Sequence, residues 1–134
     1  MNLVRYHKIK SIIDPRGSLF PIEGNRDIPF AIKRVYFLRD LLPDVPRGFH
    51  AHRQLQQIAV CVSGSCSFVL DNGRDAECVE IAHPGVGLMI DKLVWHEMHS
   101  FSDDCVLMVI ASDYYDERDY IRDYSDFKRI CGIT

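Results

Sequence analysis

The chain has 134 residues, enough for one domain with a single hydrophobic core and too few for two. Its apolar fraction of 47% and charged fraction of 26% are those of an ordinary globular domain, which excludes a disordered or fibrous chain. The net charge of -3, from 16 basic and 19 acidic residues, provides no basic field for nucleic acid, so we expect no nucleic-acid partner.

Charged residues interrupt the beginning of the chain at Arg5, Lys8 and Lys10, where a signal peptide would need an unbroken apolar segment. No later apolar run is long enough to span a bilayer. We therefore expect residues 1–134 to form a single cytoplasmic domain without membrane contact.

Short apolar segments separated by turn signals follow one another along the chain. A turn is expected at Asp14–Gly17, a break at Ser63-Gly64 and a hairpin at Asn72-Gly73, because Asn and Gly accept positive φ. Strands are expected at residues 30–38, 55–70, 78–81, 86–90, 93–98 and 105–111. Such closely spaced strands predict an all-β fold, an antiparallel β-barrel or sandwich.

The tail has a different pattern. Apolar residues recur there every three or four positions, which predicts one short helix or two helical turns packed on the barrel. Asp116 or Asp119 is placed to cap the first turn. The apolar positions are Tyr120, Ile121, Tyr124, Phe127 and Ile130.

Five cysteines are present, an odd number with no C-x-x-C pair, and four of them lie in apolar, strand-like runs. This favours small, reduced, buried side chains over a zinc site or a disulfide framework. The five are Cys61, Cys66, Cys78, Cys105 and Cys131.

Two histidines one residue apart, His50 and His52, are the main functional signal. Side chains two residues apart on a strand share a face, so both imidazoles are expected to enter one cavity. Gln54 and Gln56 have the same parity, and the apolar residues up to Val62 continue that face, which suggests a strand running from the mouth of a barrel toward its closed end. His96, in a later strand, adds a third imidazole.

These residues resemble the motifs of the cupin superfamily: a glycine, a His-x-His pair, a carboxylate, a closing glycine and a later histidine. The matching positions are Gly48, His50, His52, Gly64 and His96. Gln56 or Gln57 takes the place of the carboxylate, and an amide is a much weaker metal ligand than Glu. We therefore expect no metal and no other cofactor, and we expect the imidazoles to transfer protons near neutral pH.

Most of the chain is similar to a narrower group within the cupins, the nucleotide-sugar 3,4-ketoisomerases with their WxcM-like domain. The matching stretches are "DPRGSL", "IPFAIKRVYFL", "RGFHAHRQLQQIAVCVSGSCSFVLDNG", "WHEM" and "ASDYYDERDYIRDY". The resemblance implies an RmlC-like cupin jelly roll that acts without metal. It also implies a homodimer whose subunits exchange their N-terminal strands.

The implied reaction moves the ketone of dTDP-4-keto-6-deoxyglucose from C4 to C3 through an enediol. We assign His50 as the base at C3 and His52 as the group that delivers or relays a proton at C4 or its oxygen, although the order could be reversed. Tyr36 is a candidate donor to a sugar oxygen. Arg16 together with His96 resembles the pattern that yields the galacto product at C4.

The diphosphate requires cations, and the planar fork of arginine suits it. Arg47 and Arg122 are the first candidates, and Arg5 is a third if its strand is exchanged between subunits. Gln54 and Gln56 are candidates to orient the histidines or to contact the nucleotide. The resemblance also suggests that an aminotransferase acts on the product, in the biosynthesis of lipopolysaccharide O-antigen or of another bacterial surface polysaccharide.

Two other functions remain open from the sequence. One is a metal-dependent cupin enzyme such as a dioxygenase, with His50, His52 and His96 as ligands and Gln56 or water completing the shell. The other is a non-catalytic cupin that binds a sugar nucleotide. Insensitivity to chelators would exclude the first, and turnover would exclude the second.

Overall fold

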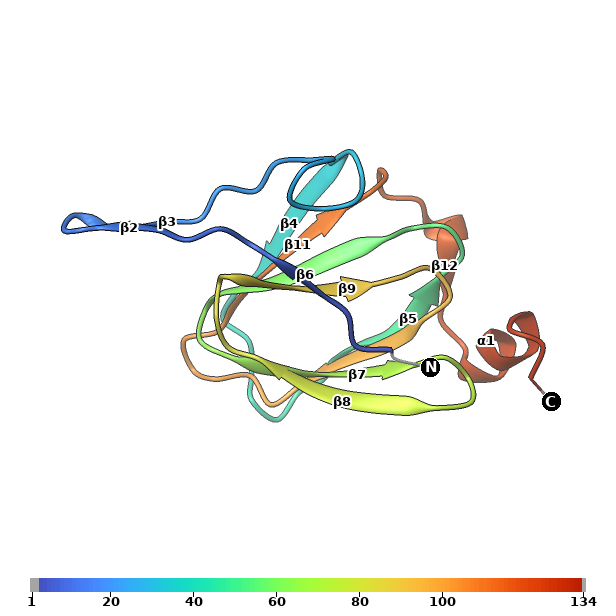
Figure 1. Ribbon diagram of the computed structural model, residues 1–134. Helices are drawn as coiled ribbons and strands as arrows, with labels where there is room; N and C mark the ends of the chain where they lie inside the picture. Colours follow the sequence, from blue (N-terminus) through green and yellow to red (C-terminus); the bar gives the residue numbers. More distant parts are fainter. Residues whose placement is uncertain (1–2, 134) are drawn as a thin grey trace.

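The computed structural model describes residues 3–133, and it consists of two five-stranded antiparallel sheets facing each other (Figure 1). The first sheet has the order β1-β9-β6-β11-β4: Tyr6–Lys8, Val86–Ile90, Gln57–Ser63, Val106–Ala111 and Arg34–Leu38. The second has the order β12-β5-β10-β7-β8: Tyr120–Ile121, Arg47–His52, Trp95–His99, Cys66–Asp71 and Ala76–Ile81. The predicted antiparallel β-barrel of jelly-roll type is confirmed.

The main core cluster lies between the sheets, and β6 is the central strand of the first sheet. Ala59 and Cys61 on β6 pack into the cluster between the sheets, whereas Ile58 and Val60 pack outward under residues 20–32. Both faces of β6 are therefore buried, which explains a continuous apolar run in place of alternation. Of the five free cysteines, Cys61, Cys66 and Cys105 are core residues as predicted, but Cys78 is exposed and Cys131 half-buried.

The predicted continuous strand through the two histidines and the glutamines was wrong. Strand β5 ends at His52, residues 53–56 cross to the other sheet, and β6 begins there at Gln57. Side-chain oxygens of the tail accept the backbone N–H groups of the crossing: Asp119 accepts from Gln54, and Ser112 accepts from Gln56. These bonds replace the strand ladder, so the two-residue parity stops at His52.

The tail folds as a 3₁₀ turn (η1, Glu117–Asp119), strand β12 and a short helix (α1, Tyr124–Ile130). Of the two predicted caps, Asp116 is the one that caps the 3₁₀ turn, and Asp123 caps α1. Tyr120 and Ile121, predicted to be helical, instead pair with β5, where Tyr120 lies opposite His52. No helix among residues 3–133 has the length and apolar character that crossing a membrane requires.

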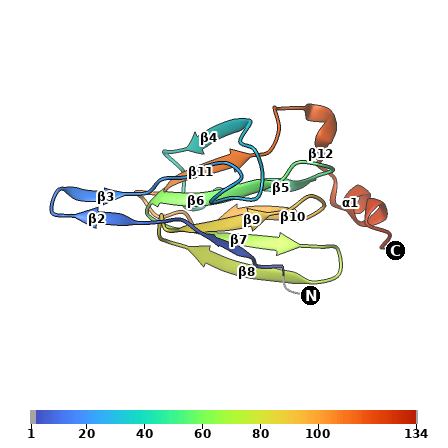
Figure 2. The same ribbon diagram turned by 45° about the horizontal axis from the view of Figure 1, so that its top comes forward.

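Two of the predicted turns are confirmed, and each joins the strands of a hairpin. Strands β7 and β8 join through Asn72-Gly73, with Gly73 at φ 94°. Strands β2 (Ile12–Asp14) and β3 (Gly17–Leu19) meet at the predicted Asp14–Gly17 turn. Figure 2 shows that this second hairpin extends away from the two sheets.

Candidate active site

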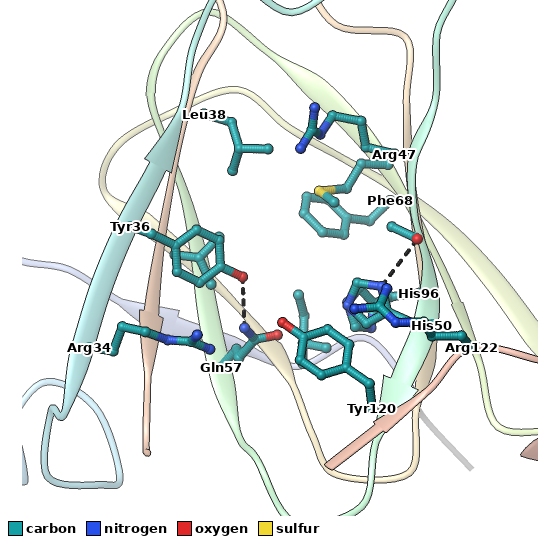
Figure 3. Close-up of a pocket in the computed structure, with 14 residues that line it drawn as sticks. Arg34, Tyr36, Leu38, Arg47, His50, Gln57, Phe68, His96, Tyr120 and Arg122 are labelled. Atoms are coloured by element: carbon teal, nitrogen blue, oxygen red, sulfur yellow. Dashed lines mark hydrogen bonds between the residues drawn. The ribbon is translucent and has the colours of Figure 1, made fainter. Parts of the chain in front are cut away.

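The main cavity opens between the two sheets and has a volume of about 370 Å³ (Figure 3). Side chains from both sheets line it, so its shape depends on how the sheets pack together. The lining comprises Arg34, Tyr36, Leu38, Arg47, Gly48, His50, Gln57, Phe68, Ile90, His96, Met98, Val109, Tyr120 and Arg122.

A β-bulge fixes the position of His50. Strand β10 pairs His96 with His50 and Glu97 with Gly48, so Phe49 is an extra residue on β5. Gly48 and Phe49 have φ values of 93° and 61°, and a Cβ at Gly48 would lie 2.9 Å from the His96 carbonyl oxygen. Only glycine fits there, which gives the glycine of the sequence motif a physical reason.

Three imidazoles meet at this wall of the cavity. The ring centroid of His50 lies 5.0 Å from that of His52 and 4.6 Å from that of His96. His50 and His96 line the main cavity, whereas His52 lies beside them and borders a second cavity of about 150 Å³. The three histidines therefore lie together, but the expectation that His50 and His52 enter one cavity was wrong, because His52 lines the second cavity and His50 the main one.

Backbone carbonyls determine how two of these rings are oriented. Nδ1 of His50 is 3.1 Å from the Gly48 oxygen, and Nδ1 of His96 is 3.2 Å from the Val94 oxygen. A carbonyl oxygen accepts only, so each Nδ1 carries the hydrogen when these bonds form. The Nε2 lone pair of His50 is then available to accept a proton.

Burial makes all three imidazoles weak bases. Desolvation lowers the pKa of His50, lowers that of His52 to about 4, with His50 adding to the effect, and lowers that of His96 to about 3. The rings are therefore neutral at neutral pH. A neutral imidazole is the form that acts as a base.

Acid is expected to destabilise the fold before the carboxylates titrate. In the unfolded chain His52 and His96 regain pKa values near 6.5, so below that pH the unfolded chain binds protons that the folded one does not. The free energy of unfolding should fall by about 1–3 kcal/mol per pH unit between pH 6 and 5. Urea titrations at pH 7, 6 and 5 measure this slope, and His96→Asn should flatten it; an unchanged slope in that variant would contradict the assignment.

The opposite wall of the cavity carries Tyr36 and Gln57. The Gln57 amide donates a hydrogen bond of 2.8 Å to the Tyr36 hydroxyl oxygen, which leaves the hydroxyl hydrogen free to donate elsewhere. Desolvation raises the pKa of Tyr36, so it stays protonated. Gln57, rather than Gln56, is the glutamine that reaches the main cavity.

Cations surround the mouth of the cavity. Arg47 and Arg122, both predicted, line it, and the Arg122 guanidinium pairs with Glu117 at 2.8 Å and stacks over the Tyr120 ring at 4.3 Å. Arg34 was not predicted, although its parity with Tyr36 on the strand could have indicated it. Tyr120 was missed because its segment was taken as helical.

Besides His52, four predicted site residues lie outside the main cavity of their own chain. Arg16 is at the tip of the β2–β3 hairpin, where it pairs with Asp14 at 2.7 Å. Arg5 and Gln56 both contact Asp91, at 2.6 and 3.0 Å. Gln54 borders the second cavity instead.

Comparison with known proteins places the chain in one family by sequence and finds solved structures with the same fold. Residues 2–132 match the protein family described as FdtA: WxcM-like, C-terminal. The chain is 57% identical over 120 residues to the TDP-4-oxo-6-deoxy-alpha-D-glucose-3,4-oxoisomerase of Aneurinibacillus thermoaerophilus, covering 90% of this chain and 86% of that protein.

Solved structures agree. The sugar 3,4-ketoisomerase QdtA of Thermoanaerobacterium thermosaccharolyticum, in complex with TDP, superimposes with a TM-score of 0.94 at 45% identity, over 97% of this chain and 95% of that one. A His-to-Asn mutant of QdtA in complex with TDP-4-keto-6-deoxyglucose superimposes with a TM-score of 0.95 at 44% identity, over 98% and 95% of the two chains.

Proposed function

Since the chain belongs to the FdtA, WxcM-like family and is a sugar 3,4-ketoisomerase, we propose that it converts dTDP-4-keto-6-deoxyglucose into dTDP-3-keto-6-deoxygalactose by histidine-mediated proton transfer. The substrate is the one bound by the QdtA mutant. The observation that carries the proposal is that the neutral imidazoles of His50 and His96 share one cavity with the Tyr36 hydroxyl, and that His52 lies directly beside them.

His50 is assigned the first step. The C4 ketone acidifies the hydrogen on C3, and Nε2 of His50 removes it to give an enediol. The C3 hydroxyl then loses its proton as the new ketone forms, C4 takes up a proton, and the former ketone oxygen becomes a hydroxyl. No proton is gained or lost overall, so the residues only need to relay what the substrate provides.

The other polar groups support the enediol. His52, directly beside His50, relays a proton between the sugar oxygens and carbon, and the Tyr36 hydroxyl donates to a sugar oxygen. The ring of His96 lies 4.6 Å from that of His50, and His96 together with Arg16 selects the face of C4 that receives hydrogen. Protonation from the galacto face is the proposed outcome.

Arg16 can take this part only in a neighbouring subunit, so a homodimer with exchanged N-terminal strands belongs to the proposal. The hairpin that carries Arg16 exposes Ile12, Ile13 and Leu19, an apolar surface that a second copy would cover. Ile13→Glu should shift the light-scattering mass from dimer to monomer and cost activity. Dimers that survive this change would count against the exchange.

Arg47 is proposed to bind the diphosphate. Arg47→Ala should raise KM about tenfold while kcat stays within about twofold, since one charge-assisted contact in a partly exposed site is lost. Arg39→Ala is the control, because Arg39 pairs with Asp40 outside the main cavity. An unchanged KM for Arg47→Ala would exclude this role.

Cytoplasmic localisation is also part of the proposal. All five cysteines are free thiols, and Cys78 is exposed to solvent, which suits a reducing compartment.

A metal-dependent enzyme is a second candidate for one reason. Ring nitrogens of His50, His52 and His96 lie within 4.8 Å of one another, a spacing that could hold a metal ion. Gln57, which stands where the cupin motif has a carboxylate, is hydrogen-bonded to Tyr36, however, and carries no negative charge. Dialysis against a chelator should leave ketoisomerase activity intact, whereas loss that Zn²⁺, Mn²⁺ or Fe²⁺ restores would favour the metal enzyme.

The decisive experiment is turnover of dTDP-4-keto-6-deoxyglucose in deuterated water, followed by NMR. The proposal expects a ketone at C3 and the galacto configuration at C4. A ketone that remains at C4 would refute the reaction, and a gluco product would refute only the stereochemistry.

A further inference from the structure

The polar network behind His52 contains a carboxylate that neither the sequence motif nor the main cavity includes. Oδ2 of Asp119 lies 3.3 Å from Nδ1 of His52, and both side chains are shielded from solvent, with exposures of 17% and 2%. Asp119 is far from His52 in sequence and reaches it because β12 pairs with β5.

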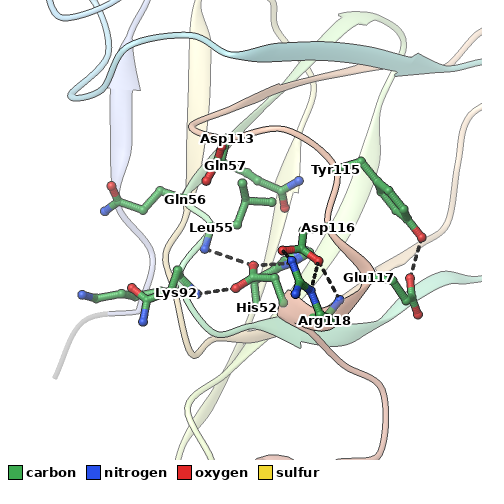
Figure 4. A network of polar contacts seen from close by, with 12 residues as sticks. His52, Leu55, Gln56, Gln57, Lys92, Asp113, Tyr115, Asp116, Glu117 and Arg118 are labelled. Carbon is green, nitrogen blue, oxygen red and sulfur yellow. Dashed lines mark hydrogen bonds and ion pairs between the residues drawn. The ribbon is translucent and has the colours of Figure 1, made fainter.

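The Asp119 carboxylate is held from two sides by the segment that follows His52. Oδ1 accepts from the backbone N–H of Gln54 at 2.8 Å, and Oδ2 accepts from that of Leu55 at 3.2 Å. The Asp119 carbonyl accepts from Arg53 N–H at 3.0 Å. Figure 4 shows His52 and Leu55 within this network.

We infer that Asp119 is a positioning residue that holds His52 in the tautomer with hydrogen on Nδ1. Among residues 3–133 neither ring nitrogen of His52 has a hydrogen bond of good geometry, and Asp119 Oδ2 lies at ion-pair distance from Nδ1. A carboxylate only accepts hydrogen bonds, so it favours Nδ1–H and leaves the Nε2 lone pair on the other side of the ring.

The location of Asp119 suits this role. It borders the second cavity and does not line the main one, so it can orient His52 without competing with His50 for the sugar. It also stabilises the imidazolium that forms while His52 carries a proton. This inference rests on the proposed function, in which His52 relays protons.

Asp119→Asn tests the inference with little change in shape. The amide has one acceptor oxygen for two backbone donors, so when that oxygen stays on the Gln54 N–H, the Leu55 N–H loses its acceptor and the NH₂ faces His52. That NH₂ donates to Nδ1 and drives His52 into the opposite tautomer. We expect kcat to fall about 10²-fold with KM within about threefold.

The matched control is Asp116→Asn, in which the same charge is removed three residues away. Asp116 caps the 3₁₀ turn, and asparagine caps equally well, so activity should stay within about twofold. If Asp116→Asn lost as much activity as Asp119→Asn, the loss would come from removing a negative charge from this loop, and the inference would be overturned.

A spectroscopic measurement separates positioning from simple structural support. Long-range ¹H–¹⁵N spectra of ¹⁵N-histidine protein report each tautomer, and a His52→Gln variant identifies the signals of His52. Wild-type His52 should show Nδ1–H, and Asp119→Asn should show Nε2–H. Finding Nε2–H in the active wild type overturns the inference, even if Asp119→Asn fails to fold. A wild type that turns over no substrate refutes the proposed function instead.

Discussion

Replacing His50 with asparagine should lower kcat by about 10³-fold while dTDP binding is retained. Asparagine keeps a polar side chain of similar length, but it cannot accept the C3 proton. The main cavity and the cations at its mouth remain, because His50 contributes one half-buried ring to a wall formed by both sheets. Product formation followed by NMR gives kcat, and calorimetric titration with dTDP gives the affinity.

His83→Asn is the matched control for this change. His83 is exposed, and its Nδ1 accepts from the backbone N–H of Gly85, a bond that an asparagine oxygen can replace. Its activity should equal that of the wild type. If His50→Asn retained more than about a tenth of kcat, another group would have to be the base at C3.

Shortening Phe127 to alanine should cost about 3–5 kcal/mol of stability. Phe127 is the fully buried residue of α1, and its side chain packs with Trp95, Ile121 and Ala51. Removing the ring leaves a void beneath β12, the strand that carries Tyr120 into the main cavity. Urea denaturation measures the loss, and activity should fall at a lower temperature than in the wild type.

Ile130→Ala provides the comparison on the same helix. Ile130 is 40% exposed, so its truncation should cost less than about 1 kcal/mol. Equal losses in the two variants would show that α1 is held by its general apolar character rather than by Phe127.

The fold was predictable from the sequence wherever the signal was local. Turn residues at Asp14–Gly17 and Asn72-Gly73 located two hairpins, since glycine and asparagine determine the backbone there. The parity of His50 and His52 placed two imidazoles on one face. The helix around Phe127 followed from its three- and four-residue spacing.

Errors arose where distant residues determine the backbone. Gln54 and Gln56 left the expected face because Asp119 and Ser112 bond the backbone between β5 and β6. The contact between the Asp119 carboxylate and His52 could not be predicted either, because nothing in a single sequence links two residues so far apart. Tyr120 fits a helical period equally well, and only pairing with β5 makes it a strand residue.

The crowding of His50, His52 and His96 has a consequence for the timing of the reaction. Positive charge on His50 lowers the pKa of both other rings, and His52 acts on His96 in the same way. Once one ring is charged, its neighbours resist charging until that hydrogen ion departs. Under the proposed mechanism the cluster therefore holds one proton at a time, so that C3 gives up its hydrogen ion before C4 receives one.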